Sequence, residues 1–132
     1  FTWSSPTLYG HVDNVNTIAI GTASDYRIKR NVEPLQDALE KVLALRPVTF
    51  DVRDIDGTEI KQKHRDVGFI AHELQEVFPS LVTGKKDDVS EDGKPLFQGV
   101  NYAVLTSVLT KAIQELHQEV STLKQQLERY TA

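Results

Sequence analysis

The stretch LTKAIQELHQEVSTLKQQLERY, residues 109–130, decides the fold of this chain. Its apolar residues recur at alternating spacings of four and three, without a break, over three heptads. Glu119 at position g and Lys124 at the following e carry opposite charges that can pair between helices. The pattern predicts a long helix over residues 101–129 and a coiled coil. Its core would be Ile113, Val120 and Leu127 at position a, with Leu109, Leu116, Leu123 and Tyr130 at position d.

An alternative use of the stripe is packing against the chain's own domain. A helix of some 25 residues is longer than a domain core of roughly 80 residues can cover, which favours the coiled coil. The residue types in the coiled-coil core indicate how many helices associate. β-Branched residues at position a, combined with Leu at position d, favour a coiled coil of two helices over one of three.

Length and composition bound the remaining possibilities. The chain has 132 residues and a mass of 14.9 kDa, enough for one domain. Hydrophobic residues make up 39% and charged residues 26%, which argues against wholesale disorder. The net charge of −4 disfavours nucleic-acid binding. The sequence contains no run of 18 apolar residues, so it predicts no membrane span. The absence of cysteine excludes disulfides, thiolate metal sites and a cysteine nucleophile.

The first 23 residues differ in composition from the rest. Residues 1–23 hold no Lys or Arg and a single Asp, and they are rich in Thr, Val, Ile and aromatic residues. This predicts short strands and turns with too few apolar residues to fold alone. The chain lacks Met and opens on Phe1, so we expect the tail of a longer polypeptide. Charged residues become frequent abruptly from Ser24 onward, which predicts a domain boundary there. With the long helix, this divides the chain into three parts, residues 1–23, 24–100 and 101–132.

The middle part predicts a small α+β domain of short strands and helices, followed by the long C-terminal helix. Pro34 suits the first turn of a helix that Pro47 ends. A strand over residues 48–53, a turn at Asp56-Gly57 and a returning strand over 58–63 predict a hairpin. A helix over 71–78 is closed by Pro79, and Leu81-Val82 can pair briefly in a sheet.

The metal and cofactor signals are weak. His11, His64, His72 and His117 lie at no metal-ligand spacing from one another, so we expect structural or surface roles. The acidic loop over residues 84–95 does not fit the EF-hand pattern and reads as a solvated loop. We therefore predict neither a metal site nor a cofactor.

Ser24 and Lys29 form the remaining candidate for chemistry. A neutral lysine amine can take the proton of a serine hydroxyl if burial and nearby positive charge depress the lysine pKa. Arg27 and Arg30 act in that direction, whereas Asp25 opposes it. A separation of five residues matches neither helix nor strand periodicity, so the pair needs a turn between them or contact across chains. The alternative is an N-cap serine and a surface lysine.

Four ordered blocks of sequence, within residues 24 to about 130, resemble one family. These blocks are Ser24–Val32 (SDYRIKRNV), Leu45–Phe50 (LRPVTF), Val67–Val82 (VGFIAHELQEVFPSLV), and Val100–Leu105 (VNYAVL) followed by Lys111–Leu116 (KAIQEL). They resemble the intramolecular chaperone domain of phage tailspikes, tail fibres and neck appendages, the S74 peptidase family. Departures from the family pattern are His72 in place of a commoner Gln and Asn101 in place of a commoner Asp. These two departures put local hydrogen bonding in doubt but do not touch Ser24 or Lys29.

The resemblance implies a function and a site. Such domains form homotrimers at the end of a β-helical fibre, bring three chains into register and then cut themselves off. It maps the nucleophile onto Ser24 and the general base onto Lys29, with cleavage at the Ala23–Ser24 junction. Which flank of Ser24 is cut stays open. The implied partners are two further copies and the upstream fibre segment, without nucleic acid or membrane.

Two other classes of function compete with a self-cleaving chaperone. A non-catalytic trimerisation or adaptor module would have the same coiled coil and no cut. A receptor-binding tip would carry an exposed aromatic or loop patch and stay on the mature particle. For the chaperone we expect the host cytoplasm during virion assembly and release from the fibre after cleavage.

Overall fold

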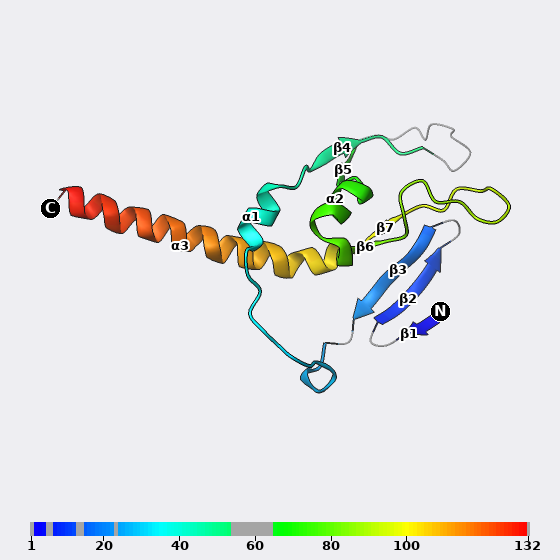
Figure 1. Ribbon diagram of the computed structural model, residues 1–132, viewed down its shortest axis with the longest axis horizontal. Coiled ribbons are helices and arrows are strands. Elements are labelled where there is room, and N and C mark those ends of the chain that lie inside the picture. The colour runs from blue at the N-terminus through cyan, green and yellow to red at the C-terminus, as the bar shows by residue number, and fades with distance from the viewer. Residues whose placement is uncertain (1, 5–6, 13–14, 23, 54–64, 132) are drawn as a thin grey trace. The chain divides into compact units, whose positions relative to one another are not determined.

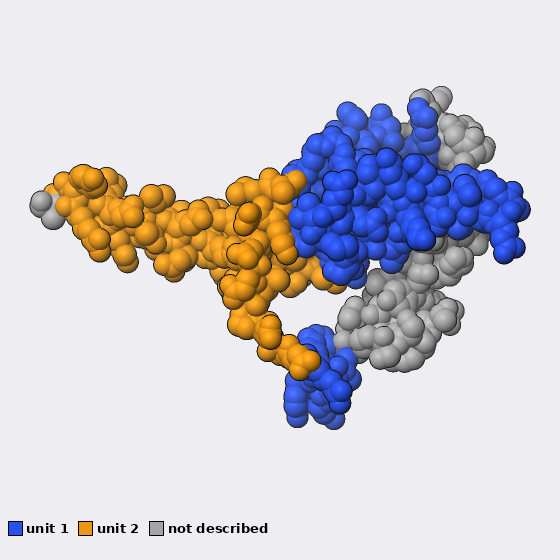
Figure 2. All heavy atoms as spheres, viewed as in Figure 1, with its two compact units in different colours: residues 1–30, 45–101 blue, residues 31–44, 102–132 orange. Residues whose placement is uncertain are grey.

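The computed structural model describes residues 2–4, 7–12, 15–22, 24–53 and 65–131 (Figure 1). Its short strands and helices, followed by one long C-terminal helix, confirm the predicted α+β class. The chain divides into two compact units, coloured separately in Figure 2. Unit 1 comprises residues 1–30 and 45–101, and unit 2 comprises residues 31–44 and 102–132. Among the described helices, none combines the length and apolar character needed to cross a membrane.

The N-terminal strip forms an antiparallel three-stranded sheet, drawn in blue in Figure 1. The strands are β1 (Thr2–Ser4), β2 (Thr7–Val12) and β3 (Val15–Thr22), in the order β1-β2-β3. Thr, Val and Ile, which favour extended backbone, are frequent in β3. The pairing of β2 with β3 shifts register twice, between Leu8 and Tyr9 and between Gly10 and Val12. The predicted strands are confirmed, and the residues that join them lie outside the described residues.

A second pair of strands lies in the middle of the chain. β4 (Val48–Phe50) pairs antiparallel with β5 (Asp66–Gly68), with Val48 opposite Gly68. β4 is thus shorter than the predicted strand over 48–53. The predicted turn at 56–57 and strand at 58–63 lie outside the described residues.

The core of unit 1 forms around a short helix. α2 (Ala71–Val77) is followed by the 3-10 turn η2 (Pro79–Leu81), which confirms the helix predicted to close at Pro79. β6 (Val82–Thr83) then pairs with β7 (Gly99–Val100). A brief strand was predicted at Leu81-Val82, and the observed strand begins one residue later. Fully or largely buried apolar side chains from these elements make the core of the unit: Leu74, Phe78, Leu81 and Val82.

An ion pair ties α2 to the segment that leads into β4. The Arg46 guanidinium donates from Nη2 to Glu73 Oε1 at 2.7 Å and from Nε to Oε2 at 3.2 Å. This two-pronged contact lowers the pKa of the Glu73 carboxyl below its ordinary value. Both side chains remain substantially exposed, at 64% and 36%, so the pair is screened by solvent.

Unit 2 packs a short helix on the long one. α1 (Ala38–Leu43) begins four residues later than the predicted start at Pro34. Asp37, the residue before it, has a left-handed backbone with φ of 56° and makes no side-chain cap. Glu115 supplies the missing cap instead, because the N–H groups of Ala38 and Leu39 donate to its two carboxylate oxygens at 3.2 and 3.0 Å.

The long helix α3 (Leu105–Thr131) has 27 residues and follows a 3-10 turn, η3 (Tyr102–Val104). Leu105, Val108 and Ala112 are buried, and their spacing places them on one face together with Glu115. The predicted heptad stripe lies on the adjacent face. Its members are all between 39% and 90% exposed: Leu109, Ile113, Leu116, Val120, Leu123, Leu127 and Tyr130.

Removing the Glu115 carboxylate tests the long-range cap. We expect Glu115→Ala to lower the free energy of unfolding by about 1–2 kcal/mol, since two backbone N–H groups lose their acceptor. Urea unfolding at one fixed protein concentration measures this difference. Glu128→Ala removes an exposed carboxylate near the end of the same helix and should change it by less than about 0.5 kcal/mol. Equal effects of the two variants would contradict the cap.

Titration of Glu73 tests the ion pair. Because Arg46 lowers the pKa of this carboxyl in the folded state, the pair stabilises the fold above the ordinary glutamate pKa. That stabilisation is lost as the pH falls through the folded pKa, below about pH 4. Carboxyl NMR titration should show the Glu73 pKa rising toward its ordinary value in Arg46→Met. An unchanged Glu73 pKa in this variant would show that the contact is absent in solution.

Candidate functional site

A single turn of 3-10 helix lies between Ser24 and Lys29. The turn, η1 (Tyr26–Ile28), has two backbone hydrogen bonds, from Ile28 N to Asp25 O at 3.2 Å and from Lys29 N to Tyr26 O at 3.1 Å. Asp25 and Lys29 on either side have extended backbones. The turn folds the chain back far enough that Lys29 Nζ lies 2.6 Å from Ser24 Oγ. The two residues thus meet within one chain, through the turn that their spacing required.

The contact between Ser24 and Lys29 can work in either direction. With a charged ammonium, Nζ donates to Ser24 Oγ, which is the hydrogen bond seen here. With a neutral amine, the same short contact lets the Ser24 hydroxyl donate to Nζ, which is the first half of proton removal. The arrangement therefore has the geometry of a nucleophile beside a general base.

The charges around this pair differ from the expectation based on sequence. Asp25 Oδ1 accepts from Arg27 Nε at 2.8 Å and Oδ2 accepts from Arg27 Nη2 at 3.0 Å. This side-chain contact, with a further bond from Arg27 N, lowers the pKa of the Asp25 carboxyl and raises the pKa of Arg27. Asp25 and Arg27 were expected to act on Lys29 with opposite signs. Their charges are instead directed at each other.

The candidate site is open to solvent in the single chain. Ser24 and Lys29 are exposed, and η1 contains no buried residue. Apolar side chains of the turn between the pair are also uncovered, with Tyr26 82% and Ile28 50% exposed. The described part of this chain therefore leaves the pair unburied. Ala23, on the far side of the predicted junction, lies outside the described residues.

The two histidines whose side chains are described lie on different helices. His72 on α2 is half-buried and lines a hollow of about 280 Å³ beside the 84–98 loop, and His117 is exposed on α3. His64 and the side chain of His11 lie outside the described residues. Within the described ranges, no group of three or more His, Asp or Glu side chains could hold a metal ion.

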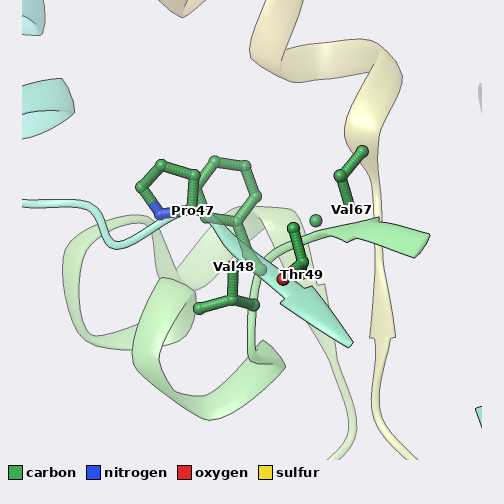
Figure 3. A pocket seen from close by; sticks show the side chains of 6 residues that line it. Pro47, Val48, Thr49 and Val67 are labelled. Atoms are coloured by element: carbon green, nitrogen blue, oxygen red, sulfur yellow. The ribbon is translucent and has the colours of Figure 1, made fainter. Parts of the chain in front are cut away.

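A second hollow offers surface without obvious chemistry. It measures about 540 Å³ and lies over β4 and β5, where Figure 3 shows Pro47, Val48, Thr49 and Val67 around it. Gly68 and Phe69 complete its lining, so none of the six residues is titratable. None of them belongs to the Ser24–Lys29 segment, and the two features are separate.

Two polar contacts escaped the sequence reasoning. Glu115 reads in the heptad as an ordinary outward-facing residue, yet it caps α1. Arg46 and Glu73 lie 27 residues apart, and no local pattern links them. Only the Asp25–Arg27 contact had a usable signal, because an Asp two residues before a backbone N–H is a common cap.

Comparisons with known proteins agree with the sequence blocks. Residues 24–83 match the model of a family described as chaperone of endosialidase, peptidase S74. The long tail fiber protein Gp37 of Enterobacteria phage Ox2 is 39% identical over 114 residues, which cover 84% of this chain and 42% of the relative.

Two further Gp37 proteins are similar to this chain. That of Enterobacteria phage M1 is 40% identical over 104 residues, covering 76% of this chain and 38% of the relative. That of Enterobacteria phage K3 is 30% identical over 127 residues, covering 96% of this chain and 10% of the relative. The chain thus spans less than half the length of each of these relatives.

Proposed function

Because residues 24–83 belong to the chaperone-of-endosialidase family, we propose that the chain is an intramolecular chaperone of a phage fibre that releases itself by autoproteolysis. It assembles as a homotrimer, brings three fibre chains into register and is then cut away at Ser24. The similarity to long tail fiber proteins supports the link to a fibre. The chaperone works in the host cytoplasm during virion assembly and leaves the fibre after the cut.

One observation carries the catalytic part of the proposal: Lys29 Nζ lies 2.6 Å from Ser24 Oγ. The neutral Lys29 amine takes the hydroxyl proton as Ser24 Oγ attacks the carbonyl carbon of Ala23. The C–N bond between the two residues breaks, the released nitrogen of Ser24 takes up a proton, and an ester links Ala23 to Oγ. Water then hydrolyses the ester, which leaves residues 1–23 on the fibre and frees residues 24–132.

Assembly provides the desolvation that the single chain lacks. Removing water from around Lys29 favours its neutral form, which is the form able to accept a proton. The uncovered Tyr26 and Ile28, in the turn between the pair, supply apolar surface for contact with partner chains or with the upstream fibre. Cleavage is thereby tied to completed assembly, and a chain that has not yet found its partners keeps its chaperone.

The exposed stripe on α3 carries the chaperone part of the proposal. Intertwined β-structures have many contacts between distant residues, so alignment of the chains is slow and prone to error. A coiled coil forms from local contacts, and its register sets the register of the chain ahead of it. Once the chaperone has been removed, an unfolded fibre cannot easily re-form, so the mature fibre is kinetically stable.

A non-catalytic trimerisation module is the second candidate. The exposed stripe on α3 supports it independently of Ser24 and Lys29, because the stripe would assemble three chains with or without a cut. The two candidates differ only in the fate of the chain after assembly.

Mass spectrometry of the expressed polypeptide tests self-cleavage. We expect the parent to yield a fragment that starts at Ser24, and both Ser24→Ala and Lys29→Ala to remain intact. Lys29→Arg is the sharpest variant, because arginine keeps the charge and the donor but cannot act as a base. It should be inactive too.

Lys86→Ala, which removes an exposed lysine from the 84–98 loop, is the matched control and should be cut like the parent. Fragments that persist in both Ser24→Ala and Lys29→Ala would refute the dyad. An intact parent on denaturing gels would favour the non-catalytic module. A fragment starting at Asp25 would move the cut to the other flank of Ser24.

Sedimentation equilibrium in the Ser24→Ala background tests the assembly. We expect a mass of three chains of 14.9 kDa for this variant, and the mass of one chain after Leu116→Asp with Leu123→Asp. Those changes place charges in the coiled-coil core, where they cannot be solvated. The control Gln118→Asp with Gln125→Asp adds the same charges at exposed f positions and should stay trimeric. A mass of two chains would refute the trimer. It would agree with the two-helix coiled coil that the residues at positions a and d favour.

A further inference from the structure

In the described part of the chain, local polar contacts hold the turn that brings Lys29 to Ser24. η1 has three residues, none of them buried, so packing within the described chain does not fix it. A short exposed turn of this kind is marginal by itself, because two backbone bonds must offset the ordering of several residues. Some further contact has to close it.

Asp25 supplies that contact. Its Oδ1 accepts from the backbone N–H of Arg27 at 2.9 Å, which is the N-cap arrangement at the start of η1. Its backbone carbonyl accepts from Ile28 N, so the same residue closes the turn twice. If this cap were lost, Lys29 would spend less time within reach of Ser24.

The carboxylate that caps the turn is also a hazard for the pair. A free Asp25 side chain, four residues before Lys29, could capture the Lys29 ammonium and hold it in the charged form. Arg27 prevents this, because its guanidinium occupies both carboxylate oxygens in a planar fork. Lys29 Nζ consequently meets Ser24 Oγ and not Asp25.

We propose that Asp25 is a positioning residue for the Ser24–Lys29 pair, and that Arg27 keeps the Asp25 carboxylate from competing with Ser24 for Lys29. Neither residue reacts with the bond that is cut. The inference rests on the proposed self-cleavage, and it adds two residues whose side chains decide how often the pair is correctly assembled.

The rate of self-cleavage in variants of the full chain tests the positioning role of Asp25, with the fragment followed over time by intact mass. Asp25→Ala removes the cap and should slow cleavage about tenfold. Asp25→Asn keeps an oxygen acceptor for Arg27 N and should restore the rate to within about threefold of the parent. Glu91→Ala, which removes an exposed carboxylate from the 84–98 loop, should leave the rate unchanged.

A double-mutant comparison tests the role of Arg27. Arg27→Ala alone should slow cleavage, because the freed carboxylate then pairs with Lys29. Combining it with Asp25→Asn should bring the rate of cleavage back up. If both substitutions were merely structural losses, their effects would add and cleavage would be slower still. Cleavage of Asp25→Ala at the parent rate would refute the inference and leave the dyad intact. A parent that is not cut, or a Ser24→Ala variant that is, would refute the proposed function itself.

Discussion

The long helix α3 carries two adjacent apolar faces, and the described chain covers only one of them. Leu105, Val108 and Ala112 are buried on the face that α1 joins, whereas the heptad stripe is exposed from Leu109 to Tyr130. Leaving such a stripe in water is unfavourable, because each partly exposed leucine forgoes a share of the about 1.5–3 kcal/mol that full burial contributes. Association through this stripe is the physical constraint on which the proposed chaperone depends.

Polar contacts fix the local geometry within each unit. Glu115 on the long helix caps α1. Arg46, in the segment before β4, forms an ion pair with Glu73 on α2. Asp25 and Arg27 close the turn that joins Ser24 to Lys29. Because these contacts lie at or near the surface, each contributes modestly to stability. Their effect is geometric: they set the point at which a helix begins or at which two reactive groups meet.

The elements that could be predicted from sequence are those with local causes. The end of α2 was predicted because Pro79 closes it, and α3 was predicted because the heptads run unbroken. The start of α1 could not be predicted, since Pro34 is an ordinary first-turn residue and nothing nearby indicates the left-handed Asp37. The turn between Ser24 and Lys29 was recognised as a requirement, but the residues that close it were assigned to another role.

The sequence by itself determined the periodic features and the chemical types: the apolar stripe, the short helix before Pro79, and a serine five residues before a lysine. Each depends on residues that are close together along the chain, so spacing and side-chain type suffice to read it. Only the tertiary structure decided which face of α3 receives α1, that Glu115 caps that helix, and that Arg27 engages Asp25 and leaves Lys29 to Ser24. These choices are competitions among several possible partners, and geometry in three dimensions settles them because hydrogen bonds and ion pairs form only over a few ångströms.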